Sequence, residues 1–401
     1  MALHKNNWVR GILILVIVLT AAFLSGWSQM GGAATDDRLA ELGLSPNWVD
    51  GQFRNINKRA EIDLNAAMQS WLGEEPPHSA PETTIPIVRR TAEDYAVPPK
   101  SGLRVTWLGH SSTLIEIDGY RILVDPVWGE RASPFGWMGP KRFHDAPIAL
   151  EDLPALDAIV ISHDHYDHLD YDTIQHFVQQ RVPFIVPLGV GTHLRYWGIS
   201  DDRITELDWW DTHQLGGLTF TATPARHQSG RTLELSDTWQ TLWAGWSIKS
   251  DAHSVYYSGD TSMFPGMADI GRRLGPFDVT LIDSGAYNQL WADNHLGPEQ
   301  AVQAHELVGG KLMIPVHWGT FYLAPHAWTE PVERVIAAAQ LKGVKIATPR
   351  PGESIEPGSG NLVNRWWPAV PWRTADEFPI VSSGLEGMDG VPVEHPRAQV
   401  D

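Results

Sequence analysis

The sequence predicts an α/β protein in which two mixed β-sheets pack face to face and helices flank their outer faces. Strand-like and helix-like segments alternate through the middle of the chain, and several predicted strands end in His or Asp. The chain has 401 residues, of which 43% are hydrophobic and 19% charged. These values are typical of a globular protein, and the length allows one large domain or two to three small ones.

Apolar residues at every second position predict strands at 104–108, 113–117 and 121–124. Asp118-Gly119 favours a hairpin turn between the last two. Farther along, apolar runs predict strands at 156–162, 183–188, 218–225, 254–259, 278–285 and 311–319. Helical spacing of apolar residues predicts helices at 171–180, 189–198, 267–275, 297–309 and 329–343.

Residues 1–34 are predicted to form a signal peptide or an N-terminal membrane anchor. Lys5 and Arg10 precede an apolar run at 11–24, and a positive region before an apolar run is typical of export signals. The run of about 14 residues is short for a spanning helix. No sharp cleavage site follows, so removal and retention both stay open. The expected location is the bacterial envelope, either periplasmic or membrane-anchored.

The rest of the chain divides into three predicted parts. Residues 35–100 form an N-terminal segment that is helical over Thr35–Leu72 and then wraps irregularly, because 74–100 is rich in Pro, Thr and charge. Residues 101–360 form the main domain. Residues 361–401 are expected to be a C-terminal tail, extended or partly disordered.

Charge and cysteine content exclude some functions. A net charge of −18 argues against a nucleic-acid partner, which needs a basic face. Bound metal ions would still permit an anionic substrate, since they reverse the local sign. The absence of cysteine excludes disulfides and thiolate ligands.

The segment "HDHYDH" predicts a metal site. His163, His165, Asp167 and His168 directly follow the strand at 156–162, and neutral imidazole and carboxylate are preferred ligands of divalent metals. A solvated histidine-rich loop is the alternative.

Single residues of the same kinds follow three other predicted strands, namely His227, Asp260 and His317. Strand ends are where layered α/β proteins place their sites. In an extended chain the side chains of His163 and His165 face the same side, so they would share one metal ion. His227 would complete the set of ligands of that ion. Asp167 and His168 point to the position of a second metal ion, whose set of ligands His317 would complete. Asp260 would bridge the two ions. Ten other histidines are expected to be ordinary surface or core residues: His4, His78, His144, His176, His193, His213, His253, His305, His326 and His395.

The motif and its surroundings resemble a known family. HxHxDH followed by single His, Asp and His at strand ends is similar to the metallo-β-lactamase superfamily. Longer strings narrow the resemblance to N-acyl-phosphatidylethanolamine-hydrolysing phospholipase D and its bacterial relatives, among them "TWLGHSSTLIEIDGYRILVDPVW", "RASPFGWMGPKRF", "ELDWWD", "GRRLGPFD", "PEQAV" and "HWGTF". This similarity runs from about residue 47 to 341.

The resemblance implies a metallo-β-lactamase-like αββα sandwich, two zinc ions and a phospholipid substrate at a membrane surface. It implies cleavage of N-acyl-phosphatidylethanolamine to phosphatidic acid and an N-acylethanolamine. The metal ligands would be His163, His165, Asp167, His168, His227, Asp260 and His317, with catalytic roles for Asp167, Asp260 and His295. The chain departs from the family at "QSG" after His227 and at Asp283, two positions expected at the pocket rim.

Three cations are candidates for contact with the phosphate or headgroup, or are solvated surface residues: Lys141, Arg142 and Arg231. Other functions stay open, including a lactonase, a soluble phosphodiesterase and a non-catalytic metal-binding envelope protein. Seven ligand-type residues for two ions leave open coordination positions. Because structural zinc sites are usually closed, this favours an enzyme.

Overall fold

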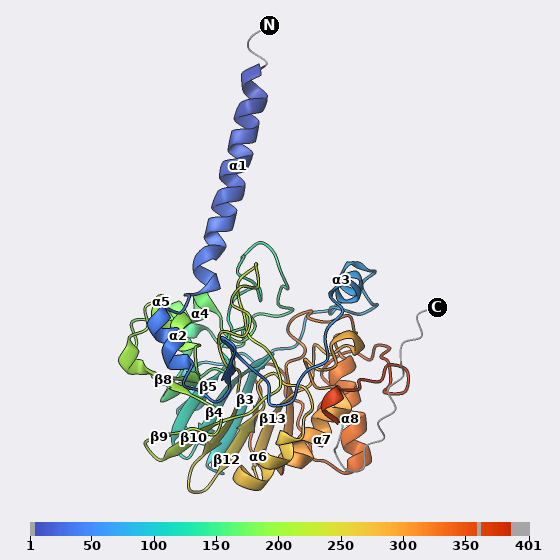
Figure 1. Ribbon diagram of the computed structural model, residues 1–401. Helices are drawn as coiled ribbons and strands as arrows, with labels where there is room; N and C mark the ends of the chain where they lie inside the picture. The colour runs from blue at the N-terminus through green and yellow to red at the C-terminus, as the bar shows by residue number, and fades with distance from the viewer. Residues whose placement is uncertain (1–4, 359–361, 386–401) are drawn as a thin grey trace.

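Two β-sheets stacked face to face form the centre of the protein in the computed structural model, which describes residues 5–358 and 362–385 (Figure 1). In spatial order, the first sheet contains β15 (Ser354–Ile355), β3 (Leu103–Gly109), β4 (Ser112–Ile117), β5 (Tyr120–Val124), β6 (Ala158–Val160), β7 (Phe184–Pro187) and β8 (Ile204–Leu207). The second contains β14 (Met313–Val316), β13 (Val279–Asp283), β12 (Ser254–Tyr257), β11 (Gly245–Lys249), β10 (Leu218–Thr223) and β9 (Thr212–Leu215). Both sheets are mixed, since antiparallel pairs such as β4–β5 adjoin parallel pairs such as β5–β6.

The first sheet is buried on both faces, and alternate residues of its strands enter two different cores. In β5, Ile122 and Val124 join the core between the sheets, whereas Leu123 joins the core under the helices outside. This follows from the two-residue period of a strand. A sheet covered on both sides therefore explains the continuous apolar runs in the sequence.

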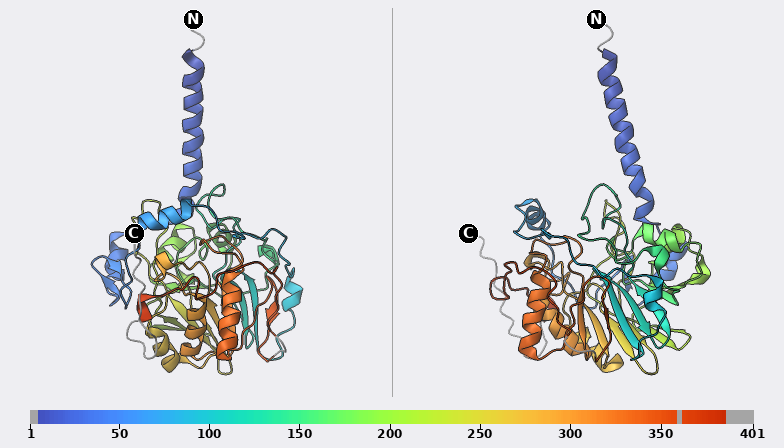
Figure 2. Two further views of the ribbon diagram at one scale, coloured as in Figure 1. Left: turned by 90° about the vertical axis from the view of Figure 1, so that its right-hand side faces the viewer. Right: turned by 180° about the vertical axis from the view of Figure 1, so that it is seen from behind.

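Helices cover the outer faces, as predicted (Figure 2). α4 (Tyr171–Phe177) and α5 (Gly191–Tyr196) contribute Ile174 and Leu194 to the outer core of the first sheet. The second sheet is covered by α6 (Gly266–Leu274), α7 (Pro298–Val308) and α8 (Glu330–Lys342). α7 begins with Pro298 at its first turn and ends at Gly309 in the left-handed conformation, which are favourable start and stop residues. The predicted αββα sandwich is confirmed.

The predicted hairpin turn is present, because Asp118 and Gly119 both adopt positive φ, +47° and +90°, as a type I′ turn requires. Besides β15 and a two-stranded hairpin near the N-terminus, three strands were not predicted, namely β8, β9 and β11. β8 and β9 read "ITEL" and "THQL", which lack a clear apolar alternation. Their pairing partners, rather than their own sequences, specify these strands.

The prediction of helix throughout Thr35–Leu72 is wrong in its middle. Two helices, α2 (Asp36–Leu42) and α3 (Leu64–Leu72), are separated by a hairpin of β1 (Trp48–Val49) and β2 (Gln52–Phe53). Asp50 and Gly51 at its turn both have positive φ, a conformation that interrupts any helix. Residues 54–63 then cross the domain as an irregular arm.

α1 (Lys5–Trp27) projects from the domain as a long helix (Figure 1). Several of its apolar side chains are exposed, among them Trp8, Ile12 and Leu15. Within the described residues, no helix combines the length and apolarity needed to cross a membrane. The prediction of an export signal or anchor stays a prediction.

The described part of the C-terminal tail, residues 362–385, lies against the domain. Trp367 is buried in the main core, and Ser382 and Ser383 hydrogen-bond to Asp293. This part is extended, as predicted, but packed. The rest of the predicted tail lies outside the described residues.

Candidate metal centre

Strand ends of both sheets bring the predicted ligand residues together. The segment 163–168 follows β6, His227 follows β10, Asp260 follows β12 and His317 follows β14. These strands belong to two sheets whose ends meet at one edge of the sandwich. All seven predicted ligand residues lie there, in two adjoining groups.

The first group contains His163, His165, His227 and Asp260, whose ligand atoms lie within 4.8 Å of one another. His165 Nδ1 lies 2.9 Å from His163 Nε2 and 3.2 Å from His227 Nε2. Asp260 Oδ2 lies 3.7 Å from His163 Nε2 and 3.6 Å from His227 Nε2. Three imidazole nitrogens and a carboxylate oxygen therefore converge on one point.

The second group contains His110, Asp167, His168 and His317. Asp167 Oδ2 lies 2.9 Å from His110 Nε2 and 3.2 Å from His317 Nε2. Asp260 also reaches this group, with Oδ1 3.1 Å from His168 Nε2 and Oδ2 3.1 Å from His317 Nε2. Asp260 therefore lies between the two groups, in the position predicted for a bridging carboxylate.

Hydrogen bonds on the outer ring nitrogens orient the histidines. His227 Nδ1 lies 2.9 Å from the backbone oxygen of Asn294, to which it donates, so the lone pair on Nε2 faces the centre. His168 Nδ1 lies 2.6 Å from Asp125 Oδ2, which also accepts from the Tyr257 hydroxyl at 2.5 Å. Such outer partners are characteristic of metal-ligating histidines.

Burial and nearby charges act in opposite directions on the pKa values of several groups in the centre. Burial disfavours the imidazolium form of His168 and His317, but nearby carboxylates, Asp260 foremost, outweigh it. They raise the pKa of His168 well above its usual value and that of His317 to about 10. Burial opposes the charged form of Asp260 as well, yet His168 and His317 hold its pKa well below the usual range. His163, by contrast, has a lowered pKa, chiefly because it is buried.

The donor set fits two divalent ions. His168 Nε2 and Asp260 Oδ1 are buried and have no hydrogen-bond partner among the described atoms, although they face each other across the centre. Buried polar atoms are almost always satisfied, and a cation between them satisfies both. The clusters therefore indicate a binuclear metal site.

Two residues of this region were not predicted in their observed places. His110 follows β3 and joins the second group, so the strand-end rule that identified His317 applies to it equally. Asp283 was expected at the pocket rim, which is wrong, because it is the last residue of β13 and fully buried. With His295, His317 and Asp260 it forms a third group of ligand-type residues.

His295 lies over the centre from the loop before α7. Its Nδ1 is 3.1 Å from Asp283 Oδ2 and 3.8 Å from Asp260 Oδ2. Its ring centroid lies 4.9 Å from that of His317. Its position just before the predicted helix at 297–309 would, without the resemblance, suggest a surface residue beside a helix, but His295 is buried.

The three cations proposed for substrate contact occupy different environments. Arg231 is buried, and its Nη1 donates to the backbone oxygens of Asp164 at 2.5 Å and Leu169 at 2.8 Å. It is neither a surface residue nor free for substrate. Lys141 is exposed and paired with Glu130 at 2.6 Å. Arg142 donates to backbone oxygens, and burial lowers its pKa to about 10.

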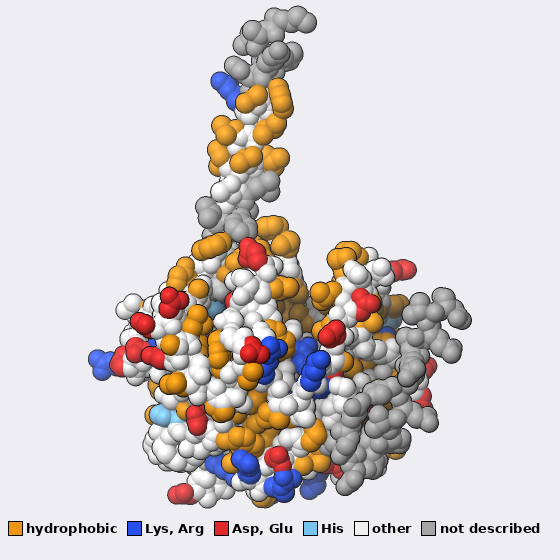
Figure 3. All heavy atoms as spheres, viewed as in Figure 1, with side chains coloured by type: hydrophobic (Ala, Val, Ile, Leu, Met, Phe, Trp, Pro, Cys, Tyr) orange, Lys and Arg blue, Asp and Glu red, His pale blue; other side chains and the backbone are white. Residues whose placement is uncertain are grey.

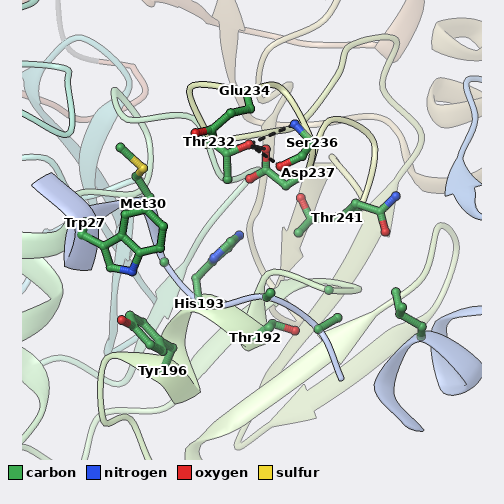
Figure 4. A pocket seen from close by; sticks show the side chains of 17 residues that line it. Trp27, Met30, Thr192, His193, Tyr196, Thr232, Glu234, Ser236, Asp237 and Thr241 are labelled. Carbon is green, nitrogen blue, oxygen red and sulfur yellow. Dashed lines mark hydrogen bonds between the residues drawn. The ribbon is translucent and has the colours of Figure 1, made fainter. Parts of the chain in front are cut away.

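His193 is buried, and it supports the residue between two ligand histidines. Asp164 accepts from Thr241 Oγ1 at 2.8 Å and lies 3.3 Å from His193 Nε2. His193 also lines a cavity of about 510 Å³ at the base of α1, together with Trp27, Met30 and Tyr196 (Figure 4). A substitution of His193 would therefore disturb the metal-binding segment. The other described histidines that were expected to be ordinary lie outside both groups. His4 and His395 lie outside the described residues.

Comparison with known proteins agrees with this architecture. Residues 120–318 match the beta-lactamase superfamily domain. An uncharacterized protein of Mycobacterium tuberculosis is 47% identical over 329 residues, covering 80% of this chain and 87% of the relative. N-acyl-phosphatidylethanolamine-hydrolyzing phospholipase D 1 of Caenorhabditis elegans is 37% identical over 295 residues, covering 68% of this chain and 80% of that enzyme.

Solved structures share the fold. An isothiocyanate hydrolase from Delia radicum gut bacteria has a TM-score of 0.51 at 21% identity, covering 63% of this chain and 98% of that structure. A metallo hydrolase of the archaeon Ignicoccus hospitalis has a TM-score of 0.50 at 24% identity, covering 63% and 97%. With the sandwich fold, the paired His/Asp clusters and these relatives, the chain belongs to the metallo-β-lactamase superfamily and is a metal-dependent hydrolase.

Proposed function

We propose that this hydrolase is a dinuclear zinc phosphodiesterase of the phospholipase D type. Its substrate would be N-acyl-phosphatidylethanolamine or a related phospholipid, cleaved to phosphatidic acid and an N-acylethanolamine. The observation that carries the proposal is the 37% identity to the Caenorhabditis elegans phospholipase over 68% of this chain. The two adjoining His/Asp groups supply the kind of centre that phosphodiester hydrolysis needs.

Ions bound in the two groups would supply Lewis acidity to the phosphoryl group and lower the pKa of water. Both Asp260 oxygens face ring nitrogens of the second group, at 3.1 Å each, and Asp167 Oδ2 faces His110 and His317. These carboxylates are therefore assigned to holding the centre. His295 Nδ1 lies 3.1 Å from Asp283 Oδ2, and His295 is the side chain assigned to protonate the leaving alkoxide.

Mass spectrometry of products tests the substrate. Purified zinc-loaded protein is incubated with N-acyl-phosphatidylethanolamine, phosphatidylethanolamine, an acyl-homoserine lactone and a nitrocefin-type lactam. We expect phosphatidic acid and N-acylethanolamine from the first substrate and little or no product from the lactam. If only the lactone ring opens, the phospholipase proposal is wrong, although the fold and the family assignment stand.

Elemental analysis tests the metal. We expect about two zinc ions per chain, because the seven predicted ligands supply two three-residue sets and a bridge. Since ligating imidazoles must be neutral, zinc affinity should fall as the pH is lowered, and zinc uptake by the chelator-treated protein should release protons. A zinc content near zero after growth with zinc would contradict the proposal, whereas iron or manganese would correct only the metal.

We also propose that the protein is exported and associates with the envelope membrane through α1. The exposed apolar side chains of its first half support this, since a large apolar surface that is exposed to water often marks a site of membrane or protein contact. Fractionation of cells that make the full chain or a chain lacking residues 1–24 tests the proposal. Recovery of both forms in the soluble cytosol would refute it.

A further inference from the structure

A groove of about 630 Å³ lies beside the metal centre, between the arm at 54–63 and the loops that carry Gln228 and Trp239. Its lining combines cations with apolar groups. The cations are Arg54, Lys58 and Arg59, the apolar side chains include Ile62, Leu64 and Trp239, and Glu61 is the acidic residue of the lining. Near the middle of the same face, Lys and Arg side chains gather where the arm crosses it (Figure 3).

The arm is held firmly against the metal centre by backbone and side-chain hydrogen bonds. Asn55 exchanges two hydrogen bonds with the backbone of His227, at 2.8 and 3.1 Å. The backbone oxygen of Lys58 accepts from Arg226 Nη2 at 2.6 Å, and Ala60 N donates to Asp293 Oδ2 at 2.6 Å. These hydrogen bonds therefore fix the groove wall in place. Its residue Gln228 directly follows His227 of the metal centre in the sequence.

The three cations have no carboxylate partner within 4.0 Å among the described residues. Arg59 donates to neutral oxygens of His227, Gln228 and Asn294 and lies over the Trp239 ring at 5.5 Å. Within the described part of the chain, the side-chain partner of Arg54 is the neutral Gln52 amide with its oxygen turned toward the guanidinium, and Lys58 is exposed. Most other arginines are paired, as Arg38, Arg195 and Arg334 are.

An anionic amphiphile matches this combination of groups. A chain with a net charge of −18 is repelled as a whole from anionic surfaces, so a local excess of unpaired cations requires its own explanation. Arginine and lysine bind phosphate oxygens, and the apolar lining suits glycerol and acyl carbons. Zwitterionic lipid alone would leave the excess positive charge uncompensated.

We propose that this groove binds the phosphate-bearing headgroup of an anionic phospholipid at a bilayer surface and presents lipid to the neighbouring metal centre. Arg54 and Lys58 contact the headgroup, and Arg59 holds the groove wall against His227. The inference rests on the proposed function, because it makes the groove the lipid-facing side of a phospholipase.

Vesicle co-sedimentation of the full-length zinc-loaded protein tests the groove directly. Binding is compared between phosphatidylcholine vesicles and vesicles with about 30% phosphatidylglycerol, at about 0.1 M salt. Wild type should prefer the anionic vesicles. In R54Q/K58Q the preference for anionic vesicles should fall by a factor on the order of 30, since each cation near an anionic surface contributes about 1 kcal/mol.

The matched control is K100Q/K345Q, which removes the same charge from two exposed lysines outside the groove. It should keep the preference to within about twofold, since exposed cations away from the bilayer interact weakly. Equal losses of the vesicle preference in both variants would contradict a lipid site in the groove. They would show instead that vesicle binding depends on net charge alone. Binding of inorganic phosphate that R54Q/K58Q abolishes, without any preference of wild type for the anionic vesicles, would identify a site for free phosphate and also overturn it.

Hydrolysis is scored separately, on wild type alone. Products from N-acyl-phosphatidylethanolamine combined with unchanged vesicle binding by R54Q/K58Q would reject the groove and keep the phospholipase. Groove-dependent vesicle binding without phospholipid products would keep the groove as a lipid site and reject the proposed reaction.

Discussion

Replacing Asp260 by Asn is expected to lower kcat by on the order of 10³-fold while the fold is kept. Asp260 contacts both groups of the metal centre, with its oxygens 3.1 Å from His168 and His317 and within 3.7 Å of His163. The amide has nearly the same shape but lacks the negative charge that two adjacent cations need. One of the two bound ions should be lost with it.

Three measurements check this prediction: turnover, zinc per chain and the circular dichroism spectrum. D202N is the matched control, because it makes the same chemical change at an exposed carboxylate on the far side of β7 from the site. D202N should keep wild-type turnover and two ions per chain. Equal loss of turnover in D202N and D260N would mean that the centre does not lie where the two groups meet.

Replacing Arg226 by Met is expected to destabilise the fold by about 3–5 kcal/mol, because it leaves the Asp293 carboxylate buried without its partner. Arg226 Nη1 and Nη2 donate to Asp293 at 2.8 and 2.9 Å, and both residues are buried. The same guanidinium contacts the arm at Lys58 and the tail at Ser383. One ion pair therefore connects three parts of the chain.

A double-mutant cycle with D293N, read from urea denaturation midpoints, checks the pairing. R226M/D293N should lose less than the sum of the single losses, since either substitution removes the same contact. The pH dependence has a defined sign. Asp293 has a lowered pKa because Arg226 and other donors outweigh its burial. Its stabilising contribution is full above the usual Asp pKa of about 4 and declines as the pH falls below it. Additive losses at every pH would contradict the pairing.

Much of the metal centre could be predicted from the sequence because its ligands obey a local rule. His163, His165, Asp167 and His168 lie within six positions after an apolar strand, and the end of a strand holds such side chains in a fixed direction. The same rule identified His227, Asp260 and His317. It also covers His110, which follows β3 and could have been found in the same way.

Other features depend on contacts between distant segments. Asp283 and His295 are isolated in the sequence, and their place in the centre arises because the end of β13 and the loop before α7 meet His317. Arg231 reads as a surface cation, yet its burial follows from carbonyl groups of residues 164, 169 and 29 that converge on it.

The sequence by itself determined the alternation of strands and helices, the αββα class and seven residues of the binuclear site, because hydrophobic periodicity and strand-end placement are local properties. Only the tertiary structure decided the hairpin between α2 and α3, the partners that orient each histidine and the cationic groove beside His227. Those features depend on which segments the two sheets bring together at one edge. Hydrogen bonds between residues more than 150 positions apart leave no recognisable pattern in the sequence of either segment alone.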